Sequence, residues 1–254
     1  MNIVTKINEW RQIKNNLAGK TIGFVPTMGH LHAGHLSLCA RSSNENDLTV
    51  VSIFVNPTQF NQASDFDLYP RTLERDSAML KSQKIDYLFL PDAKEIYQDD
   101  YQVQVTENTI STELEGLHRP GHFNGMLTVV LKLLNIIQPL RAYFGEKDYQ
   151  QVLLVKKMVN ALCVPTEIVA CETVRDDDGL ALSSRNSRLN EAQREKAGHF
   201  PRLLHGELQP EKITEQLQAL GFKVDYIAEQ WQRRLGAVWL DDVRLIDNIF
   251  LGYE

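Results

Sequence analysis

The chain has 254 residues, of which 43% are hydrophobic and 24% are charged, and its formal net charge at pH 7 is −6. A chain of this length and apolar content forms one large domain or two smaller ones around a packed core. The acidic balance argues against nucleic acid as the main partner, because phosphate backbones are bound by clustered Lys and Arg.

The cysteines and the apolar runs indicate the compartment. Cys39, Cys163 and Cys171 are odd in number and show no Cys-x-x-Cys spacing, which is typical of a reducing cytoplasm rather than of a disulfide scaffold. The N-terminal residues carry no apolar core behind basic residues, so no signal peptide is expected. No apolar run approaches the roughly 18 residues of a membrane span. We therefore expect a cytoplasmic protein without a membrane partner.

Apolar strands alternate with helices along the first two thirds of the chain. The sequence predicts helices at 6–17, 36–46, 67–84, 126–137 and 149–162, and strands at 21–25, 48–55, 86–91, 142–144 and 166–171. The alternation specifies a parallel sheet with helices on both faces, which is a Rossmann-like α/β domain.

Two segments within this domain are expected to be irregular. Residues 92–112 read as loop with a short strand at 102–106. Residues 117–125 are dense in turn-forming and cationic residues. They predict either a mobile flap over an anionic ligand or a plain surface turn.

The character of the sequence changes at 174–179, where acidic residues and a glycine follow one another. We place a domain boundary there, with a Rossmann-like domain at 1–172 and a smaller α+β C-terminal domain at 173–254. The C-terminal part is expected to contain helices at 191–204 and 210–220, and short strands at 222–227, 237–240 and 243–247.

The stretch 26–35 lies between the strand at 21–25 and the helix that follows it, and it contains His32-Ala33-Gly34-His35. A turn of this kind aims backbone N–H groups and the positive helix end at an anion. Gly34 lets a phosphate approach the backbone, and two imidazoles stabilise charge during its transfer. The alternative is a helix start that merely contains histidines. The flanking strand and helix favour the anion site.

Polar residues also follow other predicted strands. Gln59 comes just after the strand at 48–55, where open α/β sheets bind ligands, and it is either a substrate contact or a turn-capping amide. After the strand at 142–144, Lys147 suits a phosphate, and Asp148 suits a ribose hydroxyl or a helix cap. Gln151 follows one turn later. Beyond the boundary, the run 183–185 offers two hydroxyls and a guanidinium to phosphate oxygens.

Taken together, these blocks resemble the pantoate–β-alanine ligase family of the cytidylyltransferase-like (HxGH) superfamily. The matching blocks stand in the family's order, at 26–35, 51–60, 69–73, 119–123, 144–151 and 178–186. The match fades between 199 and 232 and returns at 239–248. Family members usually carry a longer C-terminal lobe, so a shortened C-terminal lid domain is expected here.

The resemblance implies an ATP-dependent ligase of coenzyme A precursor biosynthesis. Pantoate and ATP would give pantoyl adenylate and pyrophosphate, and the amine of β-alanine would then displace AMP to form pantothenate. Mg²⁺ would bridge phosphate oxygens rather than occupy a protein cage. The resemblance also implies a homodimer, with small molecules and no nucleic acid as its ligands.

The resemblance assigns roles residue by residue. His35 would be the proton donor, Gln59 and Gln151 would bind pantoate, and Gln59 would also bind β-alanine. Asp76 would assist with Mg²⁺. The catalytic set would be His32, His35, Lys147, Ser183, Ser184 and Arg185. The ATP-binding residues would be Met28, Gly29, His30, Leu31, His32, Ala33, Gly34, His35, Gly145, Glu146, Lys147, Asp148, Val174, Leu182, Ser183, Ser184 and Arg185.

Three alternatives remain at this point. Another nucleotidyltransferase would use the same histidines to join a nucleotide to a phosphate ester, but the two glutamines suit a neutral hydroxylated acid better. A nucleotide-binding regulator without chemistry would not need both histidines. A metal site at His32, His35 and His122 lacks a carboxylate or thiol at ligand spacing.

Overall fold

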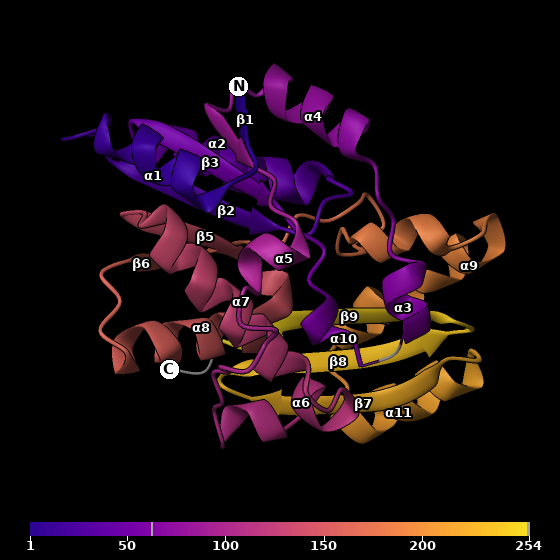
Figure 1. Cartoon of the computed structure of the whole chain (residues 1–254). Coiled ribbons are helices and arrows are strands. Elements are labelled where there is room, and N and C mark those ends of the chain that lie inside the picture. The colour runs from indigo at the N-terminus through magenta and orange to yellow at the C-terminus, as the bar shows by residue number, and fades with distance from the viewer. Residues whose placement is uncertain (62, 253–254) are drawn as a thin grey trace. The chain divides into compact units, whose positions relative to one another are not determined.

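The computed structural model describes residues 1–61 and 63–252. The chain divides into two compact units (Figure 1). The first comprises Met1–Gly145 and Gln150–Cys171, and the second comprises Glu146–Tyr149 and the chain from Glu172 onward. The division assigns a short segment after the fifth strand to the second unit, which the expected boundary at 172 does not do.

The first unit contains a six-stranded sheet in the order β1-β4-β3-β2-β5-β6. All of its neighbouring strands pair in parallel. The strands are β1 (Asn2–Val4), β2 (Ile22–Thr27), β3 (Leu48–Ile53), β4 (Tyr87–Phe89), β5 (Arg141–Gly145) and β6 (Glu167–Cys171). The chain order reverses between β2 and β5, and such a switch point is where open α/β sheets bind ligands beyond the carboxyl ends of their strands. The predicted Rossmann-like fold is confirmed.

Helices cover both faces of this sheet because successive strand residues point to opposite sides. Phe24 and Val50 belong to a core that includes Trp10 of α1 and most apolar residues of α7 and α8. Val25 and Val51 belong to a second core with residues of α2 and α4. The helices are α1 (Ile7–Asn15), α2 (Ala33–Glu45), α3 (Ala63–Asp67), α4 (Leu73–Ser82), α5 (Ala93–Ile96), α6 (Glu115–His118), α7 (His122–Ile137) and α8 (Tyr149–Ala161), with 3₁₀ turns η1 (Pro57–Gln59) and η2 (Ile110–Thr112).

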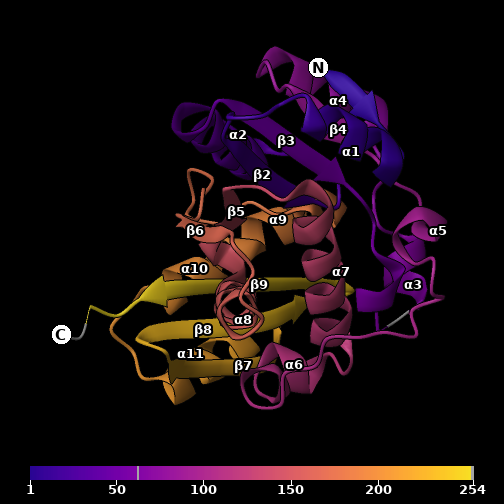
Figure 2. The ribbon, with the colours of Figure 1, turned by 60° about the vertical axis from the view of Figure 1, so that its left-hand side comes forward.

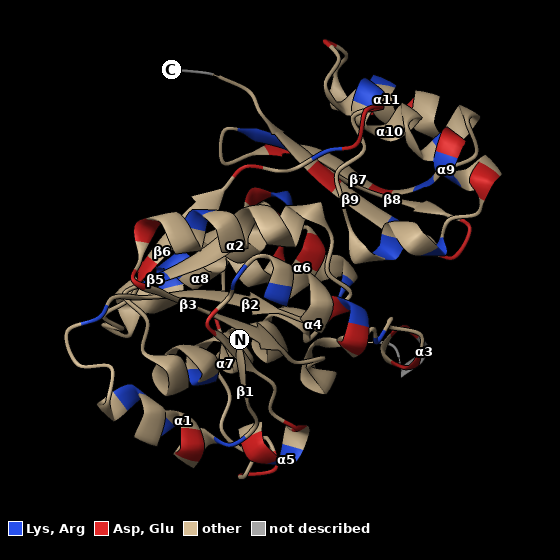
Figure 3. Ribbon diagram, turned by 90° about the horizontal axis from the view of Figure 1, so that it is seen from above, with Lys and Arg blue, Asp and Glu red and all other residues tan. Residues whose placement is uncertain are grey.

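The second unit is an antiparallel sheet, β7-β8-β9, with helices packed on it (Figure 2). Its core joins Phe200, Ile213 and Leu217 from the helices to Val238 and Leu245 of the strands. In α9, Glu191 lies in the first turn and basic residues lie in the last (Figure 3), which complements the helix dipole. The elements are η3 (Glu146–Asp148), η4 (Ser184–Arg188), α9 (Glu191–Ala197), α10 (His199–Leu204), α11 (Pro210–Ala219), β7 (Lys223–Gln230), β8 (Arg233–Leu240) and β9 (Val243–Phe250).

Several predicted elements differ from the structure. The strand expected at 102–106 is absent, and the N–H of Val105 donates instead to Thr128 Oγ1 at 2.9 Å. Residues 117–125 form neither a flap nor a plain surface turn. They join α6 to α7 at Gly121, whose φ is 80°, and His122 and Phe123 are buried. The single helix expected at 191–204 is divided between α9 and α10 at Gly198.

Among the helices that the structure describes, none combines the length and the apolar character that a membrane span requires.

Candidate active site

The turn between β2 and α2 is held by a buried carboxylate from another part of the chain. Asp76, in the first turn of α4, is 1% exposed and accepts hydrogen bonds from the backbone N–H groups of His30 (2.8 Å) and Leu31 (2.9 Å). It also accepts the hydroxyl of Thr72 at 3.1 Å. His30 adopts φ 50°, a conformation that few residues adopt without support. The carboxylate therefore fixes the backbone that leads into the two predicted catalytic histidines.

The same turn requires glycine at position 29. Gly29 has φ 82°, and a Cβ there would lie 3.1 Å from both Asp76 Oδ2 and Ile53 Cγ2. His30 is partly buried, which lowers the pKa of its imidazole. The positive charge of Arg75 acts in the same direction, and the Asp76 carboxylate opposes both. His30 is therefore neutral near pH 7.

His32 and His35 lie together at the beginning of α2. His32 is the N-cap residue, and His35 is in the first turn. Their ring centroids are 4.1 Å apart, with an interplanar angle of 42°. The first turn of α2 contains no acidic side chain, so its N–H groups and the helix dipole present positive potential beside both rings. This arrangement suits an anion such as a phosphate.

The side chain of Gln59 lies against Met28, which belongs to the stretch 26–35. Its side chain is 8% exposed, and its amide nitrogen lies 3.2 Å from the sulfur of Met28. Its amide oxygen accepts a hydrogen bond from Asn56 Nδ2 at 3.0 Å. Asn56, not Gln59, caps η1, because its side chain accepts the N–H of Thr58. The turn-capping alternative for Gln59 is therefore not supported by the structure.

Helix α7 packs directly against η1. A Cβ on Gly125 would lie 2.3 Å from the carbonyl oxygen of Thr58, so only glycine allows this approach. The ring of His122 lies with Nδ1 2.8 Å from the carbonyl oxygen of Gln59. Because a carbonyl can only accept, Nδ1 of His122 donates. His122 thus supports Gln59 rather than a metal ion.

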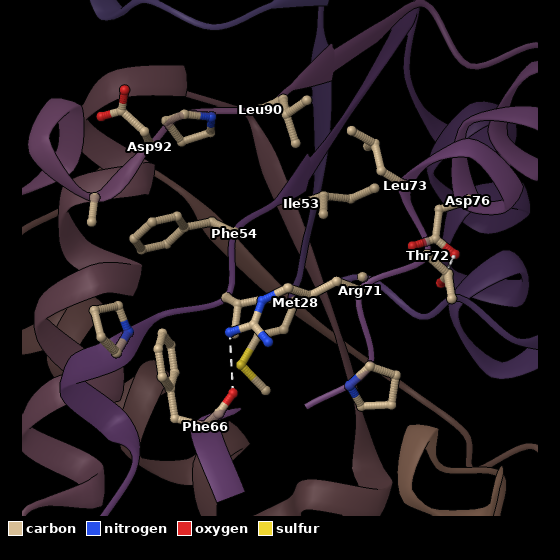
Figure 4. Close-up of a pocket in the computed structure, with 16 residues that line it drawn as sticks. Met28, Ile53, Phe54, Phe66, Arg71, Thr72, Leu73, Asp76, Leu90 and Asp92 are labelled. Atoms are coloured by element: carbon tan, nitrogen blue, oxygen red, sulfur yellow. Dashed lines mark hydrogen bonds between the residues drawn. The ribbon is translucent and has the colours of Figure 1, made fainter. Parts of the chain in front are cut away.

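A cavity of about 310 Å³ opens beyond the carboxyl ends of β3 and β4 (Figure 4). Ile53, Phe54, Phe66 and Leu90 give it apolar walls. Arg71 also lines the cavity, and its guanidinium donates to the carbonyl oxygens of residues 66, 67 and 69. The lining includes three predicted site residues, Met28, Gly29 and Asp76. Such a cavity accepts the apolar body of a small molecule.

The predicted residues at 146–148 belong to the second unit. Lys147 lies in η3, its side chain is 16% exposed, and its Nζ is 3.8 Å from Asp148 Oδ1. The side-chain amide of Asn248 donates to the carbonyl oxygens of Glu146 (2.8 Å) and Lys147 (3.0 Å). Sequence reasoning did not identify Asn248 as functional, although it lies in the matching block at 239–248.

The candidate residues between 174 and 185 lie in a hairpin and in the turn that follows it. The N–H of Leu182 donates to the carbonyl oxygen of Val174 at 3.0 Å, so these two predicted ATP contacts are opposite each other in a hairpin. Ser183 caps η4 by accepting the N–H of Arg185 at 3.2 Å. Ser184 is buried. The hydroxyls and the guanidinium therefore lie on a locally ordered turn.

Gln151 lies in the part of α8 that belongs to the first unit, and it is half-buried. Its neighbour Gln150 is buried and structural. The amide of Gln150 donates to the carbonyl oxygens of Ile110 and Glu113, both at 2.8 Å, and accepts the N–H of Glu115 at 3.1 Å.

The side chains of the described residues do not form a site that would hold a metal ion by itself. Within residues 1–61 and 63–252, no three His, Cys, Asp or Glu side chains gather as such a site would require. The Asp76 carboxylate already accepts three hydrogen bonds. Its geometry fits the role of fixing the turn and does not fit that of a Mg²⁺ ligand.

Comparison with known proteins identifies the relatives of this chain. A family model described as pantoate-beta-alanine ligase matches residues 2–250. Pantothenate synthetase of Legionella pneumophila (strain Corby) is 51% identical over 252 residues, covering 99% of this chain and 100% of the relative. The Coxiella burnetii (strain RSA 493) enzyme of the same name is 48% identical, covering 97% and 96%.

Solved structures agree with these relatives. The pantoate-beta-alanine ligase of Francisella tularensis, complexed with beta-gamma ATP and beta-alanine, is 43% identical, with a TM-score of 0.96 and coverage of 100% of this chain and 99% of that one. Pantothenate synthetase of Thermus thermophilus is 41% identical, with a TM-score of 0.91 and coverage of 99% of both chains. Compared with these proteins, the C-terminal lobe is not shortened.

Proposed function

This chain belongs to the pantoate–β-alanine ligase family, and from that premise we infer that it condenses pantoate with β-alanine to pantothenate at the expense of ATP. A pantoate carboxylate oxygen attacks the α-phosphorus of ATP, and the bond to pyrophosphate breaks. The amine of β-alanine then attacks the acyl carbon of the adenylate, the amide bond forms, and AMP leaves. The observation that carries this function is the His32–His35 pair at the positive end of α2, held by a fixed turn.

We propose that His32 and His35 stabilise the charge that develops on the phosphates during adenylation. Both steps depend on positioning and charge stabilisation rather than on an enzyme nucleophile. The close rings and the helix dipole favour an anion beside them. His35 donates a proton or hydrogen bond to a phosphate oxygen as the bond to pyrophosphate breaks.

The basic and hydroxyl candidates of the second unit bind phosphate oxygens in this proposal. Lys147 neutralises phosphate charge, and the family resemblance supports this role together with its 16% exposed side chain. Ser183, Ser184 and Arg185 donate to phosphate oxygens, which their ordered turn supports. The remaining ATP contacts are residues 28–31, 33–34, 145–146 and 148, and the hairpin pair Val174 and Leu182.

Gln59 and Gln151 bind pantoate in this proposal, and Gln59 also contacts β-alanine. Gln59 is supported by its burial against Met28 and by the hydrogen bond that Asn56 donates to it. The amide can present its remaining donor and acceptor capacity to a hydroxylated acid.

We assign Mg²⁺ to the phosphates of ATP. Mg²⁺ keeps several waters and binds through substrate phosphates in many nucleotide enzymes, and it supplies charge neutralisation there. We also propose a homodimer, on the basis of the family resemblance, and a cytoplasmic location, which the odd number and the spacing of Cys39, Cys163 and Cys171 support. Sedimentation velocity tests the dimer.

The proposed function is tested by exchange of labelled pyrophosphate into ATP. Exchange is expected with pantoate alone, and AMP release is expected only after β-alanine is added. His35→Ala should lower the exchange rate by about 10²–10³-fold, which is typical for loss of one preorganised donor. His118→Ala, which changes an exposed histidine of the first unit, is the control and should leave the rate unchanged. Exchange that required β-alanine, or normal exchange by His35→Ala, would refute the assignment.

A further inference from the structure

Two successive polar residues of β9, Asp247 and Asn248, are buried in the interior of the second unit. Each is 3% exposed. They pair with Gly236 and Leu235 of β8 in the middle of the antiparallel sheet. Successive residues of a strand point to opposite faces, so this dipeptide reaches two different parts of the unit. Buried polar groups in a strand are costly unless their hydrogen bonds are made.

Asn248 reaches the segment at 146–149. Its Nδ2 donates to the carbonyl oxygens of Glu146 and Lys147, and its Oδ1 accepts Nη1 of Arg233 at 2.8 Å. Arg233 also donates to the carboxylate of Glu146 at 2.7 Å and lies 4.1 Å from the ring centroid of Tyr149. The backbone that carries Lys147 is therefore fixed by β8 and β9.

Asp247 reaches the hairpin at 174–182. It forms a bidentate pair with Arg175, with distances of 2.6 and 2.8 Å, and the Asp247 side chain is 1% exposed. Arg175 also donates to the carbonyl oxygens of Gly179 (3.0 Å) and Asn248 (3.2 Å). Arg175 forms a bridge with Ala181 across the hairpin, next to the bonded pair of Val174 and Leu182. The hairpin is thereby attached to the same strand.

We propose that Asp247 and Asn248 are positioning residues that hold both ATP-binding segments of the second unit in one fixed geometry. Asn248 sets the backbone of Lys147, and Asp247 sets the hairpin through Arg175. Neither touches the reacting atoms. The inference rests on the proposed function insofar as that function assigns Lys147 and the hairpin to ATP.

The most direct test of this role is Asn248→Asp, which keeps the size and shape of the side chain. The substitution replaces a donor by an acceptor that faces two carbonyl oxygens, so the segment at 146–149 must shift. Misplacement of a charged group by about 1 Å costs about a hundredfold in rate. We expect pyrophosphate exchange at saturating pantoate to fall by about that factor in kcat/KM for ATP, with the KM for pantoate unchanged.

A matched control separates positioning from general stability. Asp225 lies in β7, at the edge of the sheet opposite β9, and accepts hydrogen bonds from Trp239 (3.0 Å) and Arg244 (2.8 Å). Asp225→Asn should lower the melting temperature while keeping kcat/KM for ATP. Asp247→Asn, which weakens a comparable ion pair, should lower kcat/KM for ATP as well. If Asn248→Asp does not fold, Asn248→Ala removes the same donors without adding a charge.

Combination with Lys147→Ala tests whether Asn248 acts through Lys147. The double variant Lys147→Ala/Asn248→Asp should be no slower than Lys147→Ala alone, since coupled residues are not additive. If Lys147→Ala exchanges pyrophosphate slowly while Asn248→Asp folds and exchanges at the parent's rate, this inference is overturned and the proposed function is not. Fully additive losses would also overturn it. Normal exchange by Lys147→Ala would overturn the assignment of Lys147 itself, and the inference with it.

Discussion

Asp76→Asn is the most informative single substitution in the first unit, because the sequence and the structure give Asp76 different roles. The resemblance to the family assigns it to Mg²⁺. In the structure its carboxylate accepts the N–H groups of His30 and Leu31 and the hydroxyl of Thr72. The substitution keeps the shape of the side chain but turns one acceptor into a donor. One of the two backbone N–H groups must then face an NH₂ group.

The cost follows from these contacts. A buried N–H left without an acceptor costs about 1–3 kcal/mol. Loss of negative charge in the first turn of α4 adds about 0.3–1 kcal/mol through the helix dipole. We expect the free energy of unfolding to fall by about 2–3 kcal/mol in total. The turn at His30, which adopts φ 50°, should relax, and pyrophosphate exchange should fall with it.

Urea unfolding and exchange at increasing Mg²⁺ distinguish the two roles. Glu74→Gln is the matched control, because Glu74 is an exposed acid in the same first turn of α4. It should cost only the helix-dipole contribution. If Asp76 holds the turn, raising Mg²⁺ does not restore exchange in Asp76→Asn. Unchanged stability together with full recovery at high Mg²⁺ would refute the reasoning and return Asp76 to the metal.

Three further outcomes are expected. Burial raises the pKa of the Cys39 thiol to about 12, so a thiol reagent at pH 8 should label exposed Cys163 and leave Cys39 unmodified in the folded protein, as mass spectrometry would show. Burial raises the pKa of Glu107, but hydrogen bonds from Lys157, Thr109 and Ser111 outweigh it and hold that pKa at about 2, below the ordinary 4.5. Glu107 therefore stabilises the fold above about pH 4.5 and less as the pH falls toward 2. Because Lys157 is 48% exposed and screened, Glu107→Gln should cost about 1–2 kcal/mol at pH 7 in urea unfolding. This explanation requires the stabilities of the variant and the parent to converge only as the pH falls to about 2. Gly125→Ala should displace Thr58 and Gln59, raise the KM for pantoate and lower the melting temperature, whereas Gly206→Ala, whose nearest neighbour would be 3.4 Å from the new Cβ, should do neither; an unchanged KM in Gly125→Ala would contradict the support of Gln59 by α7.

Local patterns were sufficient for most of the first unit. The apolar runs of β2 and β3 and the periodic helices between them specify a parallel sheet, because each element must bury its own apolar residues. The alternating residues at 102–106 predicted a strand that does not form. Val103 is 69% exposed, and the N–H of Val105 is bonded to a side chain of α7. A strand needs a neighbouring strand, and its presence depends on contacts far along the chain. The three-residue strand β1 was missed for the same reason, since it is defined by pairing with β4.

The candidate site divides in a similar way. The histidine motif was recognised because its turn, strand and helix are adjacent in the sequence, and the structure brings His32 and His35 to 4.1 Å. The family resemblance predicted a role for Asp76 with Mg²⁺. Its backbone partners could not be predicted, because the N–H groups that donate to it lie 46 and 45 residues away in the sequence. The sequence around an acidic residue does not indicate whether backbone N–H groups or a cation will contact its carboxylate.

The segment at 146–149 shows why one boundary along the chain cannot separate the two units, because this segment belongs to the second unit but lies between two parts of the first. It directly follows β5 of the first unit, so a change of composition places the boundary only later, near residue 172. Its hydrogen bonds instead join it to Asn248 and Arg233, residues more than 80 positions further on. Lys147 therefore belongs to the second unit, and its geometry depends on β8 and β9. A substitution in the C-terminal sheet can therefore alter the segment that we propose to bind ATP, although the substituted residue lies outside that segment.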